Sequence, residues 1–354
     1  MVDYNFYKNK KVLVIGDTGF KGSWLSYWLS QMGAEVYGYA LPPLLKISHY
    51  SLLSLDKIIE HQDGDIRDIE SLLKVFNKVK PEIVFHLAAQ ALVSKSYIDP
   101  KNTFEINIMG SVNVLEAVKK SNSVKSLVYV TSDKCYENKE WIWGYRENDE
   151  LGGYDPYSAS KASAEIIFSS YMNSFFNDKR EIGLASVRAG NVIGGGDWAP
   201  DRLIPDLVEA AKSNEQILIR NPSAVRPWQH VLEPLEGYLM LSERLFDKAP
   251  SFDEPWNFGP RELDHCNVEE LLCKFGILWG TKIDWTLQKG HSIGEAQTLR
   301  LDNMKAASRL KWHPKWDLDK ALSAAIVWYK AHDMGAEMRQ LTIGQIEDFE
   351  VLTE

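Results

Sequence analysis

Short runs of apolar, β-branched residues alternate along the first half of the chain with longer stretches whose apolar residues recur at helical spacing. Each short run predicts a buried strand, and five of them are Lys11–Ile15, Glu35–Tyr39, Glu82–Leu87, Ser126–Thr131 and Gly183–Arg188. The helical spacing is clearest in Trp24–Met32 and Thr103–Lys120. This alternation predicts an α/β fold in which helices cover a doubly wound parallel sheet.

A change of pattern after Arg188 indicates a second structural unit. The chain passes through the glycines 194–196 and then through shorter elements that prolines interrupt. We expect residues 1–190 to form the sheet domain, with a later segment, about 228–262, returning to it. Residues 191–354 are expected to form mainly a smaller C-terminal α/β lobe, and a length of 354 residues accommodates both units.

Composition and charge narrow the class of protein. Apolar residues make up 45% of the chain and charged residues 25%, which is typical of a globular protein. The net charge of −9 opposes binding to nucleic acid or to an anionic membrane surface. The 3 cysteines lack metal-ligand spacing, and no run reaches the roughly 18 apolar residues that cross a bilayer. We therefore expect a cytoplasmic protein without a metal, whose anionic ligands are held by local groups.

A glycine motif follows the first predicted strand directly. Gly16, Gly19 and Gly22 form a G-x-x-G-x-x-G pattern, with Thr18, Phe20 and Lys21 between them and an amphipathic helix predicted after them. Such a turn lets backbone N–H groups approach a pyrophosphate at a helix N-terminus. The pattern favours a Rossmann-like dinucleotide site over a plain tight turn, because it occupies the position after the first strand.

The end of the second predicted strand bears on which dinucleotide is bound. Here Ala40-Leu41-Pro42 has neither a carboxylate for the adenosine ribose nor arginines for a 2′-phosphate, which favours NAD over NADP with a weak hold on the ribose. Asp65 and Ile66 follow the third strand region and are candidates for contacting the adenine. The alternative for this segment is a solvated acidic turn.

A tyrosine and a lysine are spaced for acid–base chemistry. Asp155 is a suitable N-cap and Pro156 a suitable first helical residue, so Tyr157 and Lys161 share one face of a helix at i and i+4. An ammonium group there would favour the phenolate of the tyrosine. Such a pair is common in helices that have only a structural role. A catalytic role of the pair is favoured by Ser132-Asp133-Lys134, which follow the fourth of the five predicted strands. The carboxyl ends of these strands form the edge of the sheet where such folds bind ligands.

Together these features resemble the extended short-chain dehydrogenase/reductase family. Within it, six segments are similar to those of CDP-glucose 4,6-dehydratases and occur in the same order: GDTGFKGSWLS, PEIVFHLAAQ, TSDKCYEN, WGYRENDELGGYDPYSASKA, RAGNVIGGGDWAPDRLIPD and RNPSAVRPWQHVLEPL. The resemblance implies conversion of CDP-D-glucose to CDP-4-keto-6-deoxy-D-glucose with tightly bound NAD. It also implies that Leu87, Ala88 and Ala89 line the cofactor pocket.

The resemblance assigns roles to the residues of the motif. Tyr157 would take the proton of the glucose 4-hydroxyl, Lys161 would support it and hold the nicotinamide ribose, and Ser132 would polarise the 4-keto oxygen. Asp133 would protonate the departing C6 hydroxyl. Where dTDP- and GDP-sugar dehydratases have a glutamate base, this chain has Lys134, as CDP-glucose dehydratases do. Lys134 could be the base, an electrostatic stabiliser, or a residue that merely pairs with Asp133 or points to solvent.

Substrate contacts are expected from the second half of the chain. The guanidinium group matches phosphate oxygens, and the resemblance favours Arg226 for the diphosphate. The predicted substrate-binding residues are Asn191, Arg202, Leu203, Arg220, Arg226 and His291. His86 is interpreted as a buried structural histidine.

Two other functions compete with dehydration. One is a nucleotide-sugar 4-epimerase or decarboxylase on the same scaffold, which would not need the Asp133-Lys134 pair. The other is a non-catalytic dinucleotide-binding protein, which the Tyr157/Lys161 pair disfavours. The resemblance also implies a homodimer, with a homotetramer as the alternative, formed through the helices near Thr103–Lys120 and Tyr157–Phe176.

Overall fold

A computed structural model describes residues 2–176, 182–247, 252–288 and 296–351. Within these residues, seven strands form one sheet in the order β11-β6-β5-β4-β1-β2-β3, and every neighbouring pair is parallel. The strands are β1 (Lys11–Ile15), β2 (Glu35–Ala40), β3 (Glu60–Asp63), β4 (Ile83–His86), β5 (Ser126–Val130), β6 (Gly183–Ala189) and β11 (Trp256–Phe258). The doubly wound, Rossmann-like α/β fold is confirmed.

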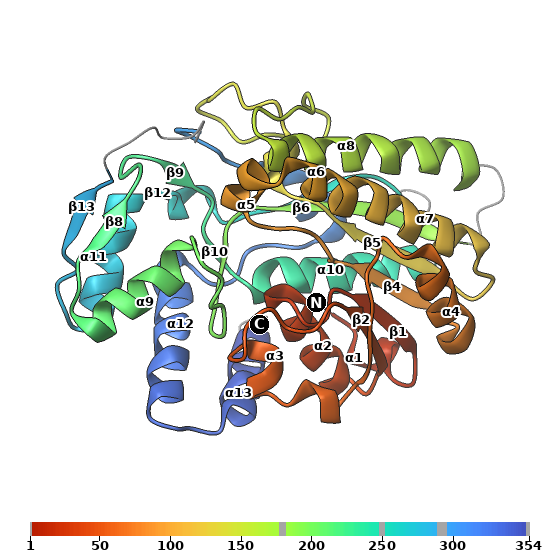
Figure 1. The fold of residues 1–354 in the computed structure, drawn as a ribbon, viewed down its shortest axis with the longest axis horizontal. Coiled ribbons are helices and arrows are strands. Elements are labelled where there is room, and N and C mark those ends of the chain that lie inside the picture. The colour runs from red at the N-terminus through yellow and green to blue at the C-terminus, as the bar shows by residue number, and fades with distance from the viewer. Residues whose placement is uncertain (1, 177–181, 248–251, 289–295, 352–354) are drawn as a thin grey trace.

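Helices cover both faces of this sheet (Figure 1). Alternate residues of β1 point to opposite faces, so Val12 and Val14 belong to one buried core and Leu13 and Ile15 to another. The helices packed on the first core include α2 (Phe20–Gln31), α10 (Leu232–Phe246), α12 (Leu318–Asp333) and α13 (Met338–Val351), and those packed on the second include α4 (Ile69–Val79), α7 (Ser111–Lys120) and α8 (Pro156–Tyr171). The remaining helices are α1 (Tyr4–Tyr7), α3 (His49–Leu52), α5 (Val93–Ile98), α6 (Pro100–Phe104), α9 (Leu203–Ser213) and α11 (Val268–Trp279).

Short strands beside the sheet build the C-terminal lobe (Figure 1). Two of the pairs are parallel and the pair of β12 with β9 is antiparallel. The pairs are β7 (Val192–Ile193) with β10 (Gln229–His230), β9 (Val225–Arg226) with β12 (Cys266–Asn267), and β8 (Ile217–Ile219) with β13 (Trp285–Leu287). The strand β11 follows most of these elements in sequence and nevertheless pairs with β6 in the main sheet.

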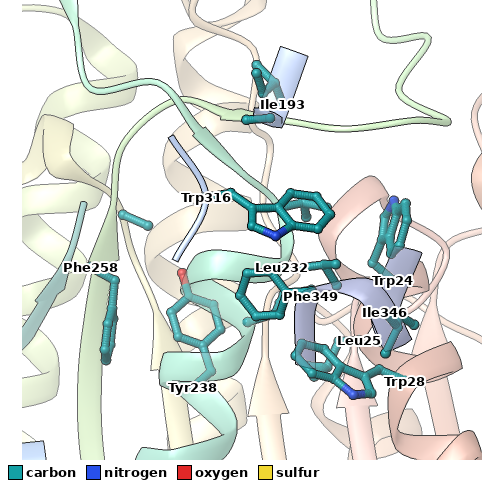
Figure 2. Close-up of a cluster of buried hydrophobic side chains, with 14 of the residues drawn as sticks. Trp24, Leu25, Trp28, Ile193, Leu232, Tyr238, Phe258, Trp316, Ile346 and Phe349 are labelled. Atoms are coloured by element: carbon teal, nitrogen blue, oxygen red, sulfur yellow. The ribbon is translucent and has the colours of Figure 1, made fainter. Parts of the chain in front are cut away.

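The helix predicted to be amphipathic after the glycine motif is buried on all sides. Every residue of α2 from Gly22 to Leu29 is buried. Figure 2 shows the reason: Trp28 lies beside Phe349 of α13, and their ring centroids are 6.1 Å apart. The helix α13 therefore covers part of the surface of α2.

The stretch predicted as one helix over Thr103–Lys120 is three segments. It comprises the end of α6, a π-helix η2 (Glu105–Gly110) and α7. A π-helix adds residues to its turn and so changes which side chains face inward. Here it buries Asn107, whose amide donates to the Ser160 hydroxyl and to the Gln90 carbonyl oxygen. The other short helices are the 3-10 helices η1 (Leu55–Lys57), η3 (Asp133–Cys135) and η6 (Glu262–Asp264), and the π-helices η4 (Met172–Phe176) and η7 (Ala306–Leu310).

Candidate active site

The glycine motif forms a closely packed turn at the carboxyl end of β1. Gly16 has φ +101°, and a Cβ on it would lie 2.6 Å from the backbone nitrogen of Ala88. A Cβ on Gly22 would lie 2.0 Å from the Gly16 carbonyl oxygen. Side chains are thus excluded on both sides of the turn, which brings the N-terminus of α2 close to β1 and to the segment after β4.

The N-terminus of α2 has the properties of an anion site. Its N-cap residue, Gly19, has no side chain to cap the first turn, and that turn has no acidic residue. The first N–H groups of a helix have no intrahelical partner, and the helix dipole favours negative charge there. Phe20, Lys21 and Gly22 make up this first turn. These residues fit the pyrophosphate of a dinucleotide.

Neighbouring segments hold the turn in place. The Thr18 hydroxyl donates to the Leu41 carbonyl oxygen at 2.8 Å, which ties the turn to the end of β2. The backbone nitrogens of Leu87 and Ala88 both donate to the Ile15 carbonyl oxygen, at 2.8 and 2.9 Å. Ala89 continues this segment after β4. The structure therefore brings together the predicted cofactor residues of β1, α2 and β4.

The segment after β3 adds a polar and an apolar group. Asp65 accepts from the Arg67 guanidinium, with Nη2 to Oδ2 at 2.6 Å, and this hydrogen bond lowers the pKa of the carboxyl group. Ile66 is buried against Gly110. Asp65 is thus already engaged with a neighbour, while it remains partly exposed at the edge expected for the adenine.

Sequence reasoning missed an ion pair beneath the glycine turn. Asp17 is fully buried, and its Oδ2 lies 2.7 Å from Nδ1 of His61 on β3. Burial raises the pKa of Asp17, although the hydrogen bond with His61 opposes the shift. The Asp17 carboxylate occupies the space that a Cβ on Gly38 would need, at 2.1 Å. The only signal in the sequence is an acidic residue inside the motif, because His61 lies 44 residues further along the chain.

The acid–base pair lies on the first turns of α8. The Asp155 carboxylate accepts from the Ser158 backbone nitrogen at 3.0 Å, and Pro156 is the first helical residue, as expected. Tyr157 and Lys161 are both buried. Burial raises the pKa of the Tyr157 hydroxyl to about 12, and hydrogen bonding with the Ser132 side chain opposes this rise. Burial lowers the pKa of Lys161 to about 8.

The segment after β5 places the other predicted catalytic residues opposite this helix. Ser132 is the N-cap of η3, and its hydroxyl donates to Oδ1 of Asp133 at 2.9 Å. Asp133 is buried, and its Oδ2 has no hydrogen-bond partner in the described part of the protein. Burial raises the pKa of Asp133, while the nearby Lys134 opposes the rise. Lys134 is half-buried beside this carboxyl group.

Four charged residues converge here and are called the Asp133 cluster: Lys21, Asp133, Lys134 and Arg226. Lys21 belongs to the glycine motif, so sequence reasoning placed it with the cofactor alone. Burial lowers the pKa of Lys21 to about 8, and the charge of Asp133 opposes this shift. The three cations of the cluster lie close enough to Asp133 to favour its ionised form. The structure therefore adds a cation from the first helix to the predicted catalytic groups.

A second buried ion pair supports α8 from below. Glu165 lies one turn after Lys161 and accepts from Nη2 of Arg188 on β6 at 2.8 Å. The hydroxyls of Thr131 and Ser186 also donate to this carboxylate. Although burial would raise the pKa of Glu165, the charge of Arg188 lowers it below its ordinary value. This carboxylate fixes α8 to β5 and β6 and so fixes Tyr157 relative to Ser132.

The structure places the predicted substrate residues in different surroundings. Arg202, the N-cap of α9, pairs with Asp197 at 2.7 Å and lies near Tyr157, while Arg226 lies near Asp133. Asn191 lies between β6 and β7, and Leu203 is the first residue of α9. Arg220 is exposed after β8 with Asp206 as its electrostatic neighbour, so it is not gathered with the others. His291 lies outside the described residues.

Comparison with known proteins identifies the family. The family model described as GDP-mannose 4,6 dehydratase matches residues 13–259. The CDP-glucose 4,6-dehydratase of Salmonella typhimurium is 50% identical over 353 residues, covering 99% of this chain and 98% of that protein. The chain belongs to the CDP-glucose 4,6-dehydratase family. Its assignment as an enzyme of the lyase class is thereby confirmed.

Solved structures share the fold of this CDP-glucose 4,6-dehydratase family member at lower identity. The UDP-glucose 4-epimerase of Thermotoga maritima, solved with UDP-glucose, has a TM-score of 0.79 and 22% identity, covering 91% of this chain and 99% of that chain. The dTDP-glucose 4,6-dehydratase of Bacillus anthracis, solved with NAD, has a TM-score of 0.77 and 22% identity, covering 93% and 99%. The scaffold is therefore common to epimerases and dehydratases.

Neither a membrane-spanning helix nor a metal-ligand group is found among the described residues. No described helix combines the length and apolar character needed to span a membrane. Among the same residues, His, Cys, Asp and Glu side chains form no group of three or more suited to hold a metal ion.

Proposed function

We propose that this chain is an NAD-dependent dehydratase that converts CDP-D-glucose to CDP-4-keto-6-deoxy-D-glucose. The observation that carries the proposal is the placement of Ser132, Asp133 and Lys134 opposite Tyr157 and Lys161, on the sequence background of a 50% identical CDP-glucose 4,6-dehydratase. A 4-epimerase does not need an acid–base pair for elimination across C5 and C6. An acid and a cation beside the tyrosine and lysine suit such an elimination.

The cofactor would be held by residues that follow β1, β3 and β4 and by residues of α2 and α8. The pyrophosphate fits the first turn of α2, and Lys161 is suited to hold the nicotinamide ribose. The predicted contacts are Gly16, Thr18, Gly19, Phe20, Lys21, Gly22, Asp65, Ile66, Leu87, Ala88, Ala89, Tyr157 and Lys161. When bound, NAD supplies the hydride acceptor for C4 and the hydride donor for C6.

Side chains of the protein accept and donate the protons that the reaction transfers. Tyr157 takes the proton of the C4 hydroxyl, and the ammonium of Lys161, one helical turn away, favours the phenolate that this requires. Ser132 donates to the developing C4 carbonyl oxygen. Asp133 gives a proton to the departing C6 hydroxyl, which its burial suits because burial favours the protonated acid. Lys134 receives the C5 proton or stabilises the enolate that forms when this proton leaves.

Local cations reconcile an anionic substrate with a protein of net charge −9. Arg202 and Arg226 lie at the site, and we propose that they contact the diphosphate of the CDP-sugar. Asn191, Leu203 and His291 stay proposed substrate contacts, and Arg220 stays a weaker proposal because it is exposed. Residues 1–190 with 228–262 are proposed as the NAD-binding unit and most of 191–354 as the nucleotide-sugar lobe.

The cellular location, the number of subunits and the use of the product are also proposed. The enzyme is expected in the cytoplasm as a homodimer or homotetramer, and its product would serve the biosynthesis of deoxysugars for lipopolysaccharide O-antigen. Exposed apolar side chains on the outer helices, among them Met109, Ile166 and Phe175, support an association through this surface. Sedimentation or light scattering measures the number of subunits.

One assay tests the activity. Purified enzyme is incubated with NAD and CDP-D-glucose, and the mixture is then made alkaline, so that a 4-keto-6-deoxy sugar shows its enolate absorbance. We expect this absorbance with CDP-D-glucose, and we expect it to form far more slowly when the Tyr157→Phe variant replaces the enzyme. Formation of CDP-galactose without enolate absorbance would instead establish a 4-epimerase, and no change in the sugar would establish a binding protein.

A further inference from the structure

The chain between β7 and α9, residues 194–202, is held to the sheet domain at both ends. At its start, the Trp24 indole nitrogen of α2 donates to the Gly195 carbonyl oxygen at 3.0 Å. Near its end, the Ser94 hydroxyl of α5 donates to Oδ2 of Asp201 at 2.6 Å. The segment therefore extends from the helix of the glycine motif to the helix that follows β4.

A buried carboxylate in this segment holds the guanidinium of Arg202. Oδ2 of Asp197 accepts from Nη1 of Arg202 at 2.7 Å, and Oδ1 of Asp197 accepts from the Ala199 backbone nitrogen at 3.1 Å. The exposed fractions of the two side chains are 8% for Asp197 and 32% for Arg202. The carboxylate therefore lies on the buried side of the pair, and the guanidinium lies on the side that a ligand can reach.

The helix α12 fixes Asp197 itself. The Tyr329 hydroxyl accepts from the Asp197 backbone nitrogen at 3.1 Å and donates to the Asp197 carbonyl oxygen. The adjacent Trp198 ring packs edge-on against the rings of Trp328 and Tyr329, with centroids 5.6 and 5.5 Å apart. Both backbone groups of Asp197 and the side chain after it are thus anchored, so its carboxylate has little freedom to move.

A guanidinium held in this way is prepared to bind an anion. Ordering a long side chain during binding costs conformational entropy, and a side chain that is already ordered in the binding pose avoids this cost. The guanidinium of Arg202 has five N–H donors, and its hydrogen bond with Asp197 uses one of them. The remaining donors match the geometry of two phosphate oxygens.

We propose that Asp197 is a positioning residue that holds Arg202 in the pose that binds the diphosphate of the CDP-sugar, an inference that rests on the proposed function. Asp197 does not contact the substrate and acts through Arg202. The negative charge of Asp197 also repels the diphosphate, so its two effects oppose each other. Orientation outweighs repulsion, because the guanidinium lies between the two anions and neutralises the carboxylate.

Calorimetric titration of the NAD-loaded enzyme with CDP tests this role, because it measures binding of the diphosphate without turnover. In Asp197→Ala we expect the Kd of CDP to rise about 3- to 10-fold, since Arg202 must then be ordered by the ligand. Asp197→Asn keeps an oxygen that accepts from Arg202 and removes the repulsion, so CDP should bind to it at least as tightly as to the wild type. Cytidine, which has no phosphate, should bind equally to all three proteins.

Two further variants separate positioning from general stability. Asp333→Ala removes the carboxylate that pairs with Lys212 at the other end of α9, at 2.8 Å, and should leave the Kd of CDP unchanged. Arg202→Ala should weaken CDP binding by itself. In that background Asp197→Ala should cause no additional loss of affinity, because the residue through which Asp197 acts is absent. Thermal unfolding measures the stability of each variant.

Three results would overturn the positioning role: unchanged CDP affinity in Asp197→Ala or in Arg202→Ala, an equal loss of affinity from Asp197→Ala with and without Arg202, or a matching loss for cytidine. None of these results depends on catalysis. If CDP binding depended on Asp197 as expected but the wild-type enzyme formed no 4-keto-6-deoxy sugar, the proposed function would fail and the positioning role would stand.

Discussion

Replacing Gly22 by alanine perturbs the contact between α2 and the turn after β1. The new Cβ would lie 2.0 Å from the Gly16 carbonyl oxygen and 2.7 Å from its carbon. Both atoms are backbone, so no side-chain rotation relieves the contact, and the turn must move by about 1 Å. Overpacking of this kind costs about 1–3 kcal/mol of stability. A shift of this size in a binding group weakens its function by up to about 10²-fold.

The chain offers a matched control for this substitution. Gly344 lies in the middle of α13, and a Cβ on it meets nothing within 4 Å. Gly344→Ala should therefore gain about 0.5–1 kcal/mol from helix propensity alone. Calorimetric titration with NAD and thermal unfolding compare the two variants.

We expect Gly22→Ala to have a lower Tm and to bind NAD about 10- to 10²-fold more weakly. Gly344→Ala should unfold at a higher temperature and bind NAD as the wild type does. If Gly22→Ala lost stability but kept its affinity for NAD, the pyrophosphate would not lie at this turn, and the reasoning from the anion site would be refuted.

Four further predictions concern the chemistry of the site. Tyr157→Phe should lower kcat by about 10²–10⁴-fold with little change in KM, and initial rates near those of the wild type would reject it as the base. Lys134→Met should still reduce NAD in single-turnover mixing, with the absorbance of the reduced cofactor persisting; normal turnover or no reduction would leave Lys134 a role in binding or structure only. Arg226→Ala should raise KM for the CDP-sugar more than it lowers kcat, and an unchanged KM would move the proposed phosphate contact to Arg202 or Arg220. Burial lowers the pKa of Lys161 to about 8, and only the charged form of Lys161 supports the phenolate, so kcat/KM should fall as pH rises through that value. A value of kcat/KM that keeps rising above this pH would disprove the dependence.

Local sequence signals were sufficient for the sheet and for part of the site. The strand Lys11–Ile15 was predicted with its observed bounds because its short run is rich in β-branched residues and a glycine turn follows it directly. The positions of Tyr157 and Lys161 on one helix followed from the N-cap Asp155 and from Pro156, which act within one turn. These features depend on residues that are neighbours in sequence.

Other features depend on contacts between distant parts of the chain. The burial of α2 requires α13, and Trp28 donates to a Glu350 carboxylate oxygen 322 residues away. The position of Lys21 beside Asp133 depends on how α2 meets η3 across the sheet edge. The π-helix at Asn107 likewise reflects partners on α8 and after β4. Periodicity along the chain contains no information on such pairings.

The packing of α13 on α2 has a consequence for the order in which the protein folds during synthesis. The strand β1 and the helix α2 leave the ribosome well before Ile346 and Phe349, which complete their hydrophobic surroundings. Until then the tryptophans of α2 lack part of their cover, and apolar surface of this kind attracts chaperones or other nascent chains. A ribosome that stalls shortly before α13 would therefore hold a chain in which the glycine turn after β1 is already synthesised but α2 is unprotected.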